Sequence, residues 1–106
     1  MYNYVSPELL MECLKYAYYH PNVFYSFYNA LPITGVDGTL RNRMRFSSAH
    51  GNIRAKTGSV TGVSSLAGYA KAKNGHEYAF VIINQNILNN KKAHNFQDKI
   101  CEILIN

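Results

Sequence analysis

The chain has 106 residues, enough for one domain with a single modest core, and its 47% hydrophobic content excludes an intrinsically disordered protein. No apolar run approaches the ~20 residues that span a bilayer, and the start, MYNYVSPELL, lacks the basic region and apolar run of a signal peptide. The net charge of +5 would suit an anionic polymer, but the basic residues are scattered, so we expect a positively charged soluble surface and no nucleic-acid partner.

Two helices are predicted within residues 6–30. Ser6 is a good N-cap, and Pro7 suits the first helical position. The first helix should end before Pro21, because a residue that precedes proline avoids the α region. A second helix is expected over residues 23–29. Three aromatic residues are predicted on its inner side: Phe24, Phe27 and Tyr28.

A loop is predicted after these helices, over residues 31–40, because proline, aspartate and two glycines punctuate it. Asp37-Gly38-Thr39 is either a turn in which the aspartate caps a backbone N–H or a segment with a chemical role, and both readings stay open. Residues 41–45 are expected to form one helical turn. Its three arginines should form a solvated face, with carboxylate pairing as the alternative: Arg41, Arg43 and Arg45.

The second half of the chain predicts an antiparallel sheet of about three strands packed with helices, which makes the fold class α+β. Strands are expected at residues 53–60, 63–72 and 77–84, and Asn74-Gly75 is a strong hairpin signal between the last two. The last strand is apolar on both faces, so we expect it to lie centrally in the sheet.

A C-terminal helix is predicted over residues 91–104. Its apolar stripe comprises Phe96, Ile100, Ile103 and Leu104. Cys13 and Cys101 fall on the apolar faces of predicted helices, so buried free thiols are expected, and a disulfide between them is the less favoured alternative. Their spacing matches no metal site, and we expect no metal and no cofactor.

Two stretches carry a resemblance to a known family. They are GVDGTLRNRM, residues 35–44, and GNIRAKTGSVTGVSSLAGYA, residues 51–70. In this order they resemble the C-terminal part of a D-alanyl-D-alanine carboxypeptidase/endopeptidase, a low-molecular-mass class C penicillin-binding protein. A lone K-T-G is a weak signal, but this context is specific. The resemblance implies a β-lactamase/transpeptidase-like fold, whose C-terminal portion would be residues 1–106, and a periplasmic or extracytoplasmic location.

The resemblance also implies that four consecutive residues bind substrate: Lys56, Thr57, Gly58 and Ser59. The family's substrate is a peptidoglycan stem peptide with a free carboxylate, which a cation and a hydroxyl can hold, and β-lactams occupy the same site. Alternation puts Lys56 and Gly58 on one face of the strand and Thr57 and Ser59 on the other. Gly58 would give clearance for a ligand backbone, and the Ser59 N–H resembles an oxyanion-hole donor. The strand should lie at a sheet edge, where an extended peptide can pair with it.

Lys56 has an alternative role, as a charged strand residue that protects an exposed sheet edge from aggregation. The family's reaction also needs Ser-x-x-Lys, which provides the nucleophile, and Ser-x-Asn. Neither pattern occurs in these 106 residues, so no catalytic residue is assigned within the chain. We therefore expect a C-terminal fragment that a penicillin does not acylate by itself.

Three classes of function follow from these patterns. The first is a segment of a cell-wall serine peptidase that works with an N-terminal part. The second is a stand-alone module that binds peptides without catalysis. The third is a small basic protein that binds a polyanion, which the absence of aromatic–basic interleaving disfavours. An exposed sheet surface would also allow homo-oligomers.

Overall fold

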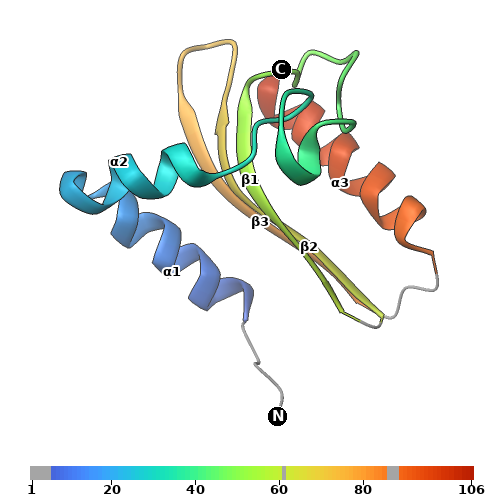
Figure 1. The fold of residues 1–106 in the computed structure, drawn as a ribbon, viewed down its shortest axis with the longest axis horizontal. Coiled ribbons are helices and arrows are strands. Elements are labelled where there is room, and N and C mark those ends of the chain that lie inside the picture. The colour runs from blue at the N-terminus through green and yellow to red at the C-terminus, as the bar shows by residue number, and fades with distance from the viewer. Residues whose placement is uncertain (1–5, 61, 86–88) are drawn as a thin grey trace.

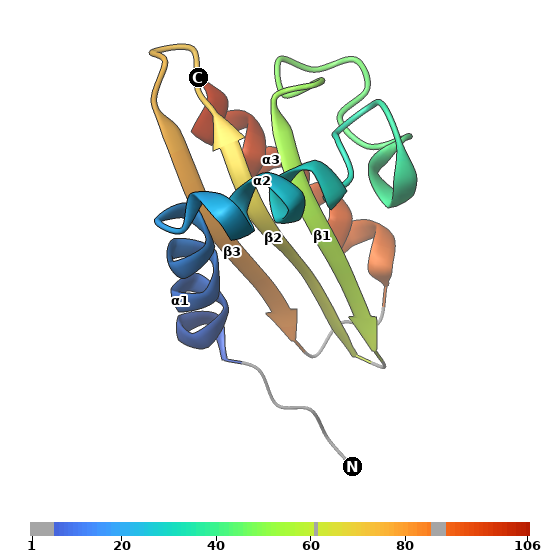
Figure 2. The same ribbon diagram turned by 60° about the vertical axis from the view of Figure 1, so that its left-hand side comes forward.

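The computed structural model of the chain describes residues 6–60, 62–85 and 89–106. They form an α+β fold in which one antiparallel sheet lies between two layers of helices (Figure 1). The elements are α1 (Pro7–Tyr18), α2 (Pro21–Ala30), the 3₁₀ turn η1 (Gly38–Leu40), β1 (Ile53–Val60), β2 (Val63–Lys71), β3 (Glu77–Gln85) and α3 (Asn90–Ile105). Figure 2 shows α1 and α2 on one face of the sheet and α3 behind the other.

Local sequence signals start the first two helices. The Ser6 hydroxyl accepts a hydrogen bond from the Leu9 N–H at 3.1 Å, which satisfies one of the free donors at the start of α1. Pro21 stands at the first position of α2, so it begins this helix as well as ending α1. The second helix is therefore longer at both ends than the predicted residues 23–29.

The predicted inner side of α2 faces the sheet, with Phe27 at its margin. Phe24 and Tyr28 are half-buried and pack around the Tyr69 ring, with ring centroids 5.3 and 5.8 Å from it. Phe27 also packs edge-to-face against the Tyr69 ring, with centroids 6.4 Å apart, although 36% of its surface stays exposed. Residues 24 and 28 are one helical turn apart and share a side, which turns Phe27 toward the margin of the contact.

The sheet has the order β1-β2-β3, so β2 is the central strand. The prediction that the apolar strand β3 lies centrally is wrong. Its two faces are apolar because a helical layer covers each of them. Ala79 and Val81 pack in the cluster under α1 and α2, whereas Phe80 and Ile82 pack in the cluster that includes α3 residues. Burial on both faces thus does not require a strand on both sides.

The helix α3 contacts the sheet through a different stripe from the predicted one. Its buried residues are Ala93, Gln97, Cys101 and Ile105. Phe96 is 52% and Ile103 is 65% exposed, so their predicted burial is wrong, while Ile100 and Leu104 are partly buried. The helix is turned so that a polar residue, Gln97, faces the sheet, and no hydrophobicity pattern favours that orientation.

The two cysteines differ in environment, and both thiols are free. Cys101 is buried, as predicted, and burial raises the pKa of its thiol to about 12. Cys13 is exposed, so the prediction for it is wrong. It lies one position before Leu14, at the margin of the face that α1 buries through Leu14 and Ala17.

Candidate functional site

The site predicted from the sequence lies on β1, an edge strand, as expected. Pro32 and Thr34 cover the beginning of its outer side: the Thr34 N–H donates to the Ile53 carbonyl, and the Ala55 N–H donates to the Pro32 carbonyl, each at 3.0 Å. Within the described residues, this short bridge is the only strand pairing on that side. From residue 56 onward, no other described segment pairs with the outer side of β1, and this stretch is called the open edge.

Alternation along β1 shows which backbone groups this open edge presents. Ile53 and Ala55 direct their ladder groups outward, toward Pro32 and Thr34. In an antiparallel strand every second residue does the same, so Thr57 and Ser59 also direct their N–H and C=O groups outward. These groups lie where an added extended chain would hydrogen-bond.

The side chains of β1 fall on the two faces in the predicted alternation. Ile53 and Ala55 pack in the cluster with α3 residues, which places Thr57 and Ser59 on that face and Lys56 and Gly58 on the face of α1 and α2. Lys56 is exposed, and its Nζ donates to the Thr57 carbonyl at 3.0 Å. The ammonium group therefore lies beside the open edge.

Thr57 contacts a residue whose importance the sequence did not reveal. Its hydroxyl donates to the hydroxyl of Thr39 in η1 at 3.1 Å. Asp37 accepts a hydrogen bond from the Ile33 N–H at 2.7 Å, so the reading of Asp37-Gly38-Thr39 as a turn with a capping aspartate is confirmed. The helical turn that was predicted for residues 41–45 instead forms at Gly38–Leu40, and this brings Thr39 to β1.

A side chain at either of two glycines in the sheet would meet neighbouring atoms, but the neighbours differ. A Cβ at Gly68 would lie 2.1 Å from the Arg54 carbonyl oxygen, so the neighbouring backbone demands glycine there. A Cβ at Gly58 would meet only the Ser65 hydroxyl, at 2.5 Å, and that hydroxyl can rotate away. The fold therefore does not require glycine at position 58, which is consistent with clearance for a ligand.

Arg43 does not belong to a solvated face. Its side chain is 10% exposed and forms an ion pair with Asp98 of α3. Carboxylate pairing, the alternative, therefore holds for this arginine, whereas Arg41 and Arg45 are exposed. The charge pattern alone could not distinguish Arg43, because its partner lies 55 residues away in the sequence.

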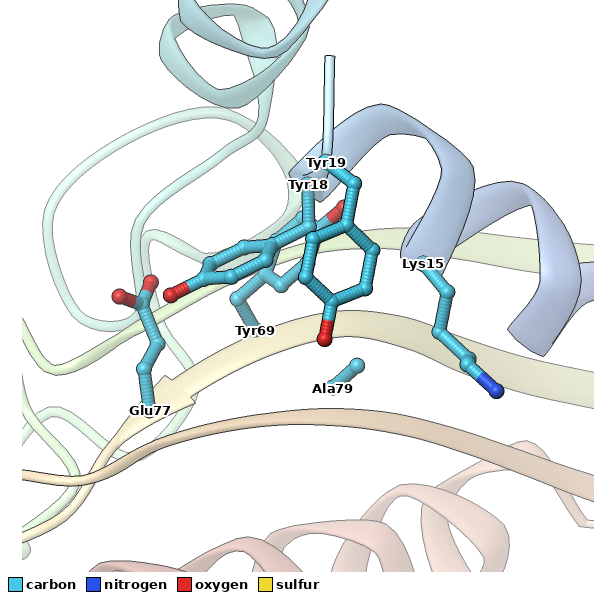
Figure 3. Close-up of a pocket in the computed structure, with 6 residues that line it drawn as sticks. All are labelled: Lys15, Tyr18, Tyr19, Tyr69, Glu77 and Ala79. Atoms are coloured by element: carbon cyan, nitrogen blue, oxygen red, sulfur yellow. The ribbon is translucent and has the colours of Figure 1, made fainter. Parts of the chain in front are cut away.

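A pocket of about 310 Å³ lies where α1 meets the strands β2 and β3 (Figure 3). Its lining residues are Lys15, Tyr18, Tyr19, Tyr69, Glu77 and Ala79. The Tyr69 hydroxyl donates to the Leu14 carbonyl at 2.6 Å, and burial together with the Glu77 carboxylate raises the pKa of Tyr69 to about 12. This phenol therefore stays protonated and is not a base. Glu77 pairs with Lys71, the last residue of β2, whereas Ser59 pairs near its start, so the pocket is distinct from the open edge.

The described residues offer no other chemistry at the open edge. Among them, no cluster of three histidine, cysteine, aspartate or glutamate side chains is arranged to hold a metal ion. None of the helices in the described segments is long and apolar enough to cross a membrane. What the edge of β1 provides is a cation, two outward-facing sets of backbone groups and a hydroxyl, which together can bind an extended peptide with a carboxylate.

Comparison with known proteins gives a consistent result. The model of a family described as the D-Ala-D-Ala carboxypeptidase 3 (S13) family matches residues 1–106. A D-alanyl-D-alanine carboxypeptidase of Actinomadura sp. (strain R39) is 48% identical over 60 residues, which are 52% of this chain and 11% of that protein. The D-alanyl-D-alanine carboxypeptidase DacB of Haemophilus influenzae is 35% identical over 82 residues, 76% of this chain and 17% of that protein.

The fold is similar to that of a solved structure as well. Penicillin-binding protein 4 (DacB) of Haemophilus influenzae, in complex with a novel β-lactam, superposes with a TM-score of 0.83 and 28% sequence identity. The match covers 95% of this chain and 25% of that one. The chain thus spans 11% and 17% of the two curated relatives and a quarter of the solved structure.

Proposed function

The chain belongs to the D-Ala-D-Ala carboxypeptidase 3 (S13) family, and we propose that it supplies the substrate-binding strand of a serine-type carboxypeptidase/endopeptidase acting on peptidoglycan stem peptides through an acyl-enzyme. The observation that carries the proposal is the open edge of β1, at which Lys56 and the outward backbone groups of Thr57 and Ser59 lie together. Residues 1–106 would form the C-terminal segment of the complete transpeptidase-like domain.

Each residue of the site has a distinct role in this proposal. The Lys56 ammonium attracts the terminal carboxylate of the stem peptide, and Thr57, held by Thr39, adds a hydroxyl. The peptide backbone pairs with the edge of β1 over the bare surface of Gly58. The Ser59 N–H donates to the oxyanion of the tetrahedral intermediate. Removal of such a donor raises the activation barrier by about 3 kcal/mol.

The nucleophile and the general base must then come from outside these 106 residues, since Ser-x-x-Lys and Ser-x-Asn are absent. The substrate polymer lies outside the cytoplasm, so the proposal implies a periplasmic or extracytoplasmic location.

A hybrid protein tests the proposal. The segment of Haemophilus influenzae penicillin-binding protein 4 that superposes on this chain is replaced by residues 1–106, and the purified hybrid is incubated with a fluorescent penicillin. We expect covalent labelling of the hybrid and none of the isolated chain. A folded hybrid, verified by circular dichroism and a cooperative thermal transition, that remains unlabelled would contradict the proposal.

A second measurement uses the isolated chain and separates catalysis from simple binding. Titration with an acyl-D-Ala-D-Ala peptide should shift the NMR resonances of the Thr57 and Ser59 amides, with a dissociation constant no tighter than about 1 mM, because one wall of a cleft buries little of the ligand. Micromolar binding by the chain alone would instead favour the non-catalytic peptide-binding module.

A further inference from the structure

Arg43 anchors the turn that carries Thr39 to helix α3. Its Nε donates to Asp98 Oδ1 at 3.0 Å, and its Nη2 donates to the same oxygen, to the His94 carbonyl and to Gln97 Oε1, the last two at 3.1 Å. The guanidinium thus binds polar groups of three residues that lie within little more than one turn of α3. The anchor is nearly closed to solvent, with 10% of the Arg43 side chain and 21% of the Asp98 side chain exposed.

Gln97 extends this contact to the sheet. Its side chain is fully buried, and its Nε2 donates to Ser64 Oγ at 3.1 Å and to Asn84 Oδ1 at 3.0 Å. Ser64 of β2 pairs directly with Ser59 of β1 on one side and with Asn84 of β3 on the other. Gln97 therefore lies under the row of residues whose outer member presents the proposed oxyanion donor.

The turn gives a second connection to the same edge. Leu40 is fully buried, and its carbonyl accepts hydrogen bonds from the N–H groups of Gly35 at 2.8 Å and Arg43 at 3.0 Å. Fixing Arg43 on α3 therefore fixes the preceding turn, whose Thr39 hydroxyl accepts the hydrogen bond from Thr57. The polar network reaches Thr57 through the turn and Ser59 through Gln97.

The network is poorly suited to a purely stabilising role. Buried ion pairs often contribute no more to stability than apolar residues of similar volume, because both charges must leave water. Within the described residues, Arg43 Nη1 is also buried without a hydrogen-bond partner, which adds an unsatisfied donor to that cost. An arrangement of this kind is better explained by the geometry that it imposes than by the free energy that it supplies.

We propose that Arg43, Gln97 and Asp98 are positioning residues that hold Thr57 and Ser59 at the open edge of β1 in the geometry that binds substrate. The inference rests on the proposed function for its consequence in catalysis, but its structural part concerns this chain alone. Substrate does not contact these three side chains, which act through Thr39, Ser64 and the backbone of β1.

The isolated chain tests the structural part through NMR relaxation. Two variants remove the network with apolar residues of similar size: Gln97→Met, and Arg43→Met combined with Asp98→Leu. We expect the order parameter of the Ser59 amide to fall from about 0.85 to about 0.6 or below, while the thermal midpoint stays within about 5 °C of the unmodified chain. The control is Ile105→Val, which trims the core below α3 without touching the network. An unchanged order parameter in the network variants, or an equal fall in the control, would overturn the inference.

The same substitutions in the hybrid protein test the consequence. The second-order rate constant for acylation by a fluorescent penicillin should fall on the order of 10-fold or more in the network variants and stay unchanged in Ile105→Val. If the rate constant falls only in proportion to the fraction of the hybrid that is folded, the positioning role is contradicted. If the unsubstituted hybrid is not labelled, the proposed function fails, and the order parameters of the isolated chain still decide whether the network orders the edge.

Discussion

Thr57 donates a hydrogen bond to Thr39 at 3.1 Å, and this contact joins the two stretches of sequence that carry the family resemblance. Thr39 and Thr57 are 18 residues apart in the chain. The turn Gly38–Leu40 packs against β1, so the first stretch acts as a support for the strand that carries the second. The contact explains why this turn accompanies the strand that we propose to bind substrate.

Removal of the Thr39 hydroxyl should weaken this support. We expect Thr39→Val to lower the free energy of unfolding by about 0.5–1.5 kcal/mol, the net contribution of one hydrogen bond, because valine keeps the shape and removes the acceptor. Urea denaturation measures the change. Thr39→Ser keeps the hydroxyl and serves as the control, and equal stability of the two variants would show that the hydrogen bond contributes nothing.

The two sheet glycines should respond differently to alanine. Gly68→Ala should prevent folding or cost several kcal/mol, because its Cβ would lie 2.1 Å from the Arg54 carbonyl oxygen. Gly58→Ala should fold, since only the Ser65 hydroxyl must rotate, yet the hybrid that carries it should lose acylation through the obstructed edge. Circular dichroism and penicillin labelling measure the two effects.

A double variant provides the control for Gly58. Adding Ser65→Ala removes the hydroxyl and leaves the nearest side-chain atom, Ser65 Cβ, at 3.9 Å, so any loss of stability should be restored. Acylation should remain low, because the methyl group at position 58 still covers the strand. Recovery of acylation together with stability would show that Gly58 serves packing alone.

The two thiols should react with a thiol reagent under different conditions. Cys13 is exposed and should react with a thiol reagent in the native chain. Cys101 should react only on unfolding, because it is fully buried and burial raises the pKa of its thiol to about 12. Ellman titration should therefore count one thiol natively and two in denaturant. A native Cys13→Ser chain that reacts as fast as the denatured one would contradict the burial of Cys101.

Acid should destabilise the chain through His94. Burial and the Arg43 guanidinium lower the pKa of His94 below its ordinary value of 6.5, although the Asp98 carboxylate opposes them. Between the lowered pKa and 6.5 the unfolded chain binds more protons, so stability rises with pH through this window and is lost as the pH falls. The thermal midpoint should be higher at pH 7.5 than at pH 5.5.

A matched pair of variants assigns that pH dependence. His94→Gln should reduce the difference between the two midpoints, while the ion pair of Arg43 and Asp98 remains, because Arg43 contacts only the backbone carbonyl of His94. His76→Gln, at an exposed turn, should keep the difference. If both substitutions leave the difference unchanged, His94 is not its source.

Local signals predicted much of this fold correctly. Alternation gave the two faces of β1, because the direction of successive side chains in a strand is a property of the backbone itself. Asn74-Gly75 gave the hairpin between β2 and β3, and Ser6 with Pro7 gave the start of α1. The edge position of β1 was predicted from what the binding of an extended ligand would require, and the sheet order confirms it.

The errors arose where contacts between distant residues decide the outcome. Hydrophobicity predicted Phe96 and Ile103 at the core, but the contacts of Gln97 and Asp98 with Arg43 turn α3 to another side. Likewise, two apolar faces predicted a central β3, whereas helical layers cover both faces of this edge strand. Thr39 could not be identified either, since its partner is reached only through the fold.

The central claim is that Lys56 and the open edge of β1 bind the substrate of a serine carboxypeptidase. The most direct test is the rate constant for acylation of the hybrid protein by a fluorescent penicillin, measured for Lys56→Met and for Lys71→Met, an exposed lysine at the far end of β2. We predict that Lys56→Met lowers this rate constant 10²-fold or more, because loss of a group that stabilises transition-state charge has an effect of about that size. We predict no change for Lys71→Met. Equal rates in the two folded variants would contradict the claim and leave Lys56 as a charge that protects a sheet edge.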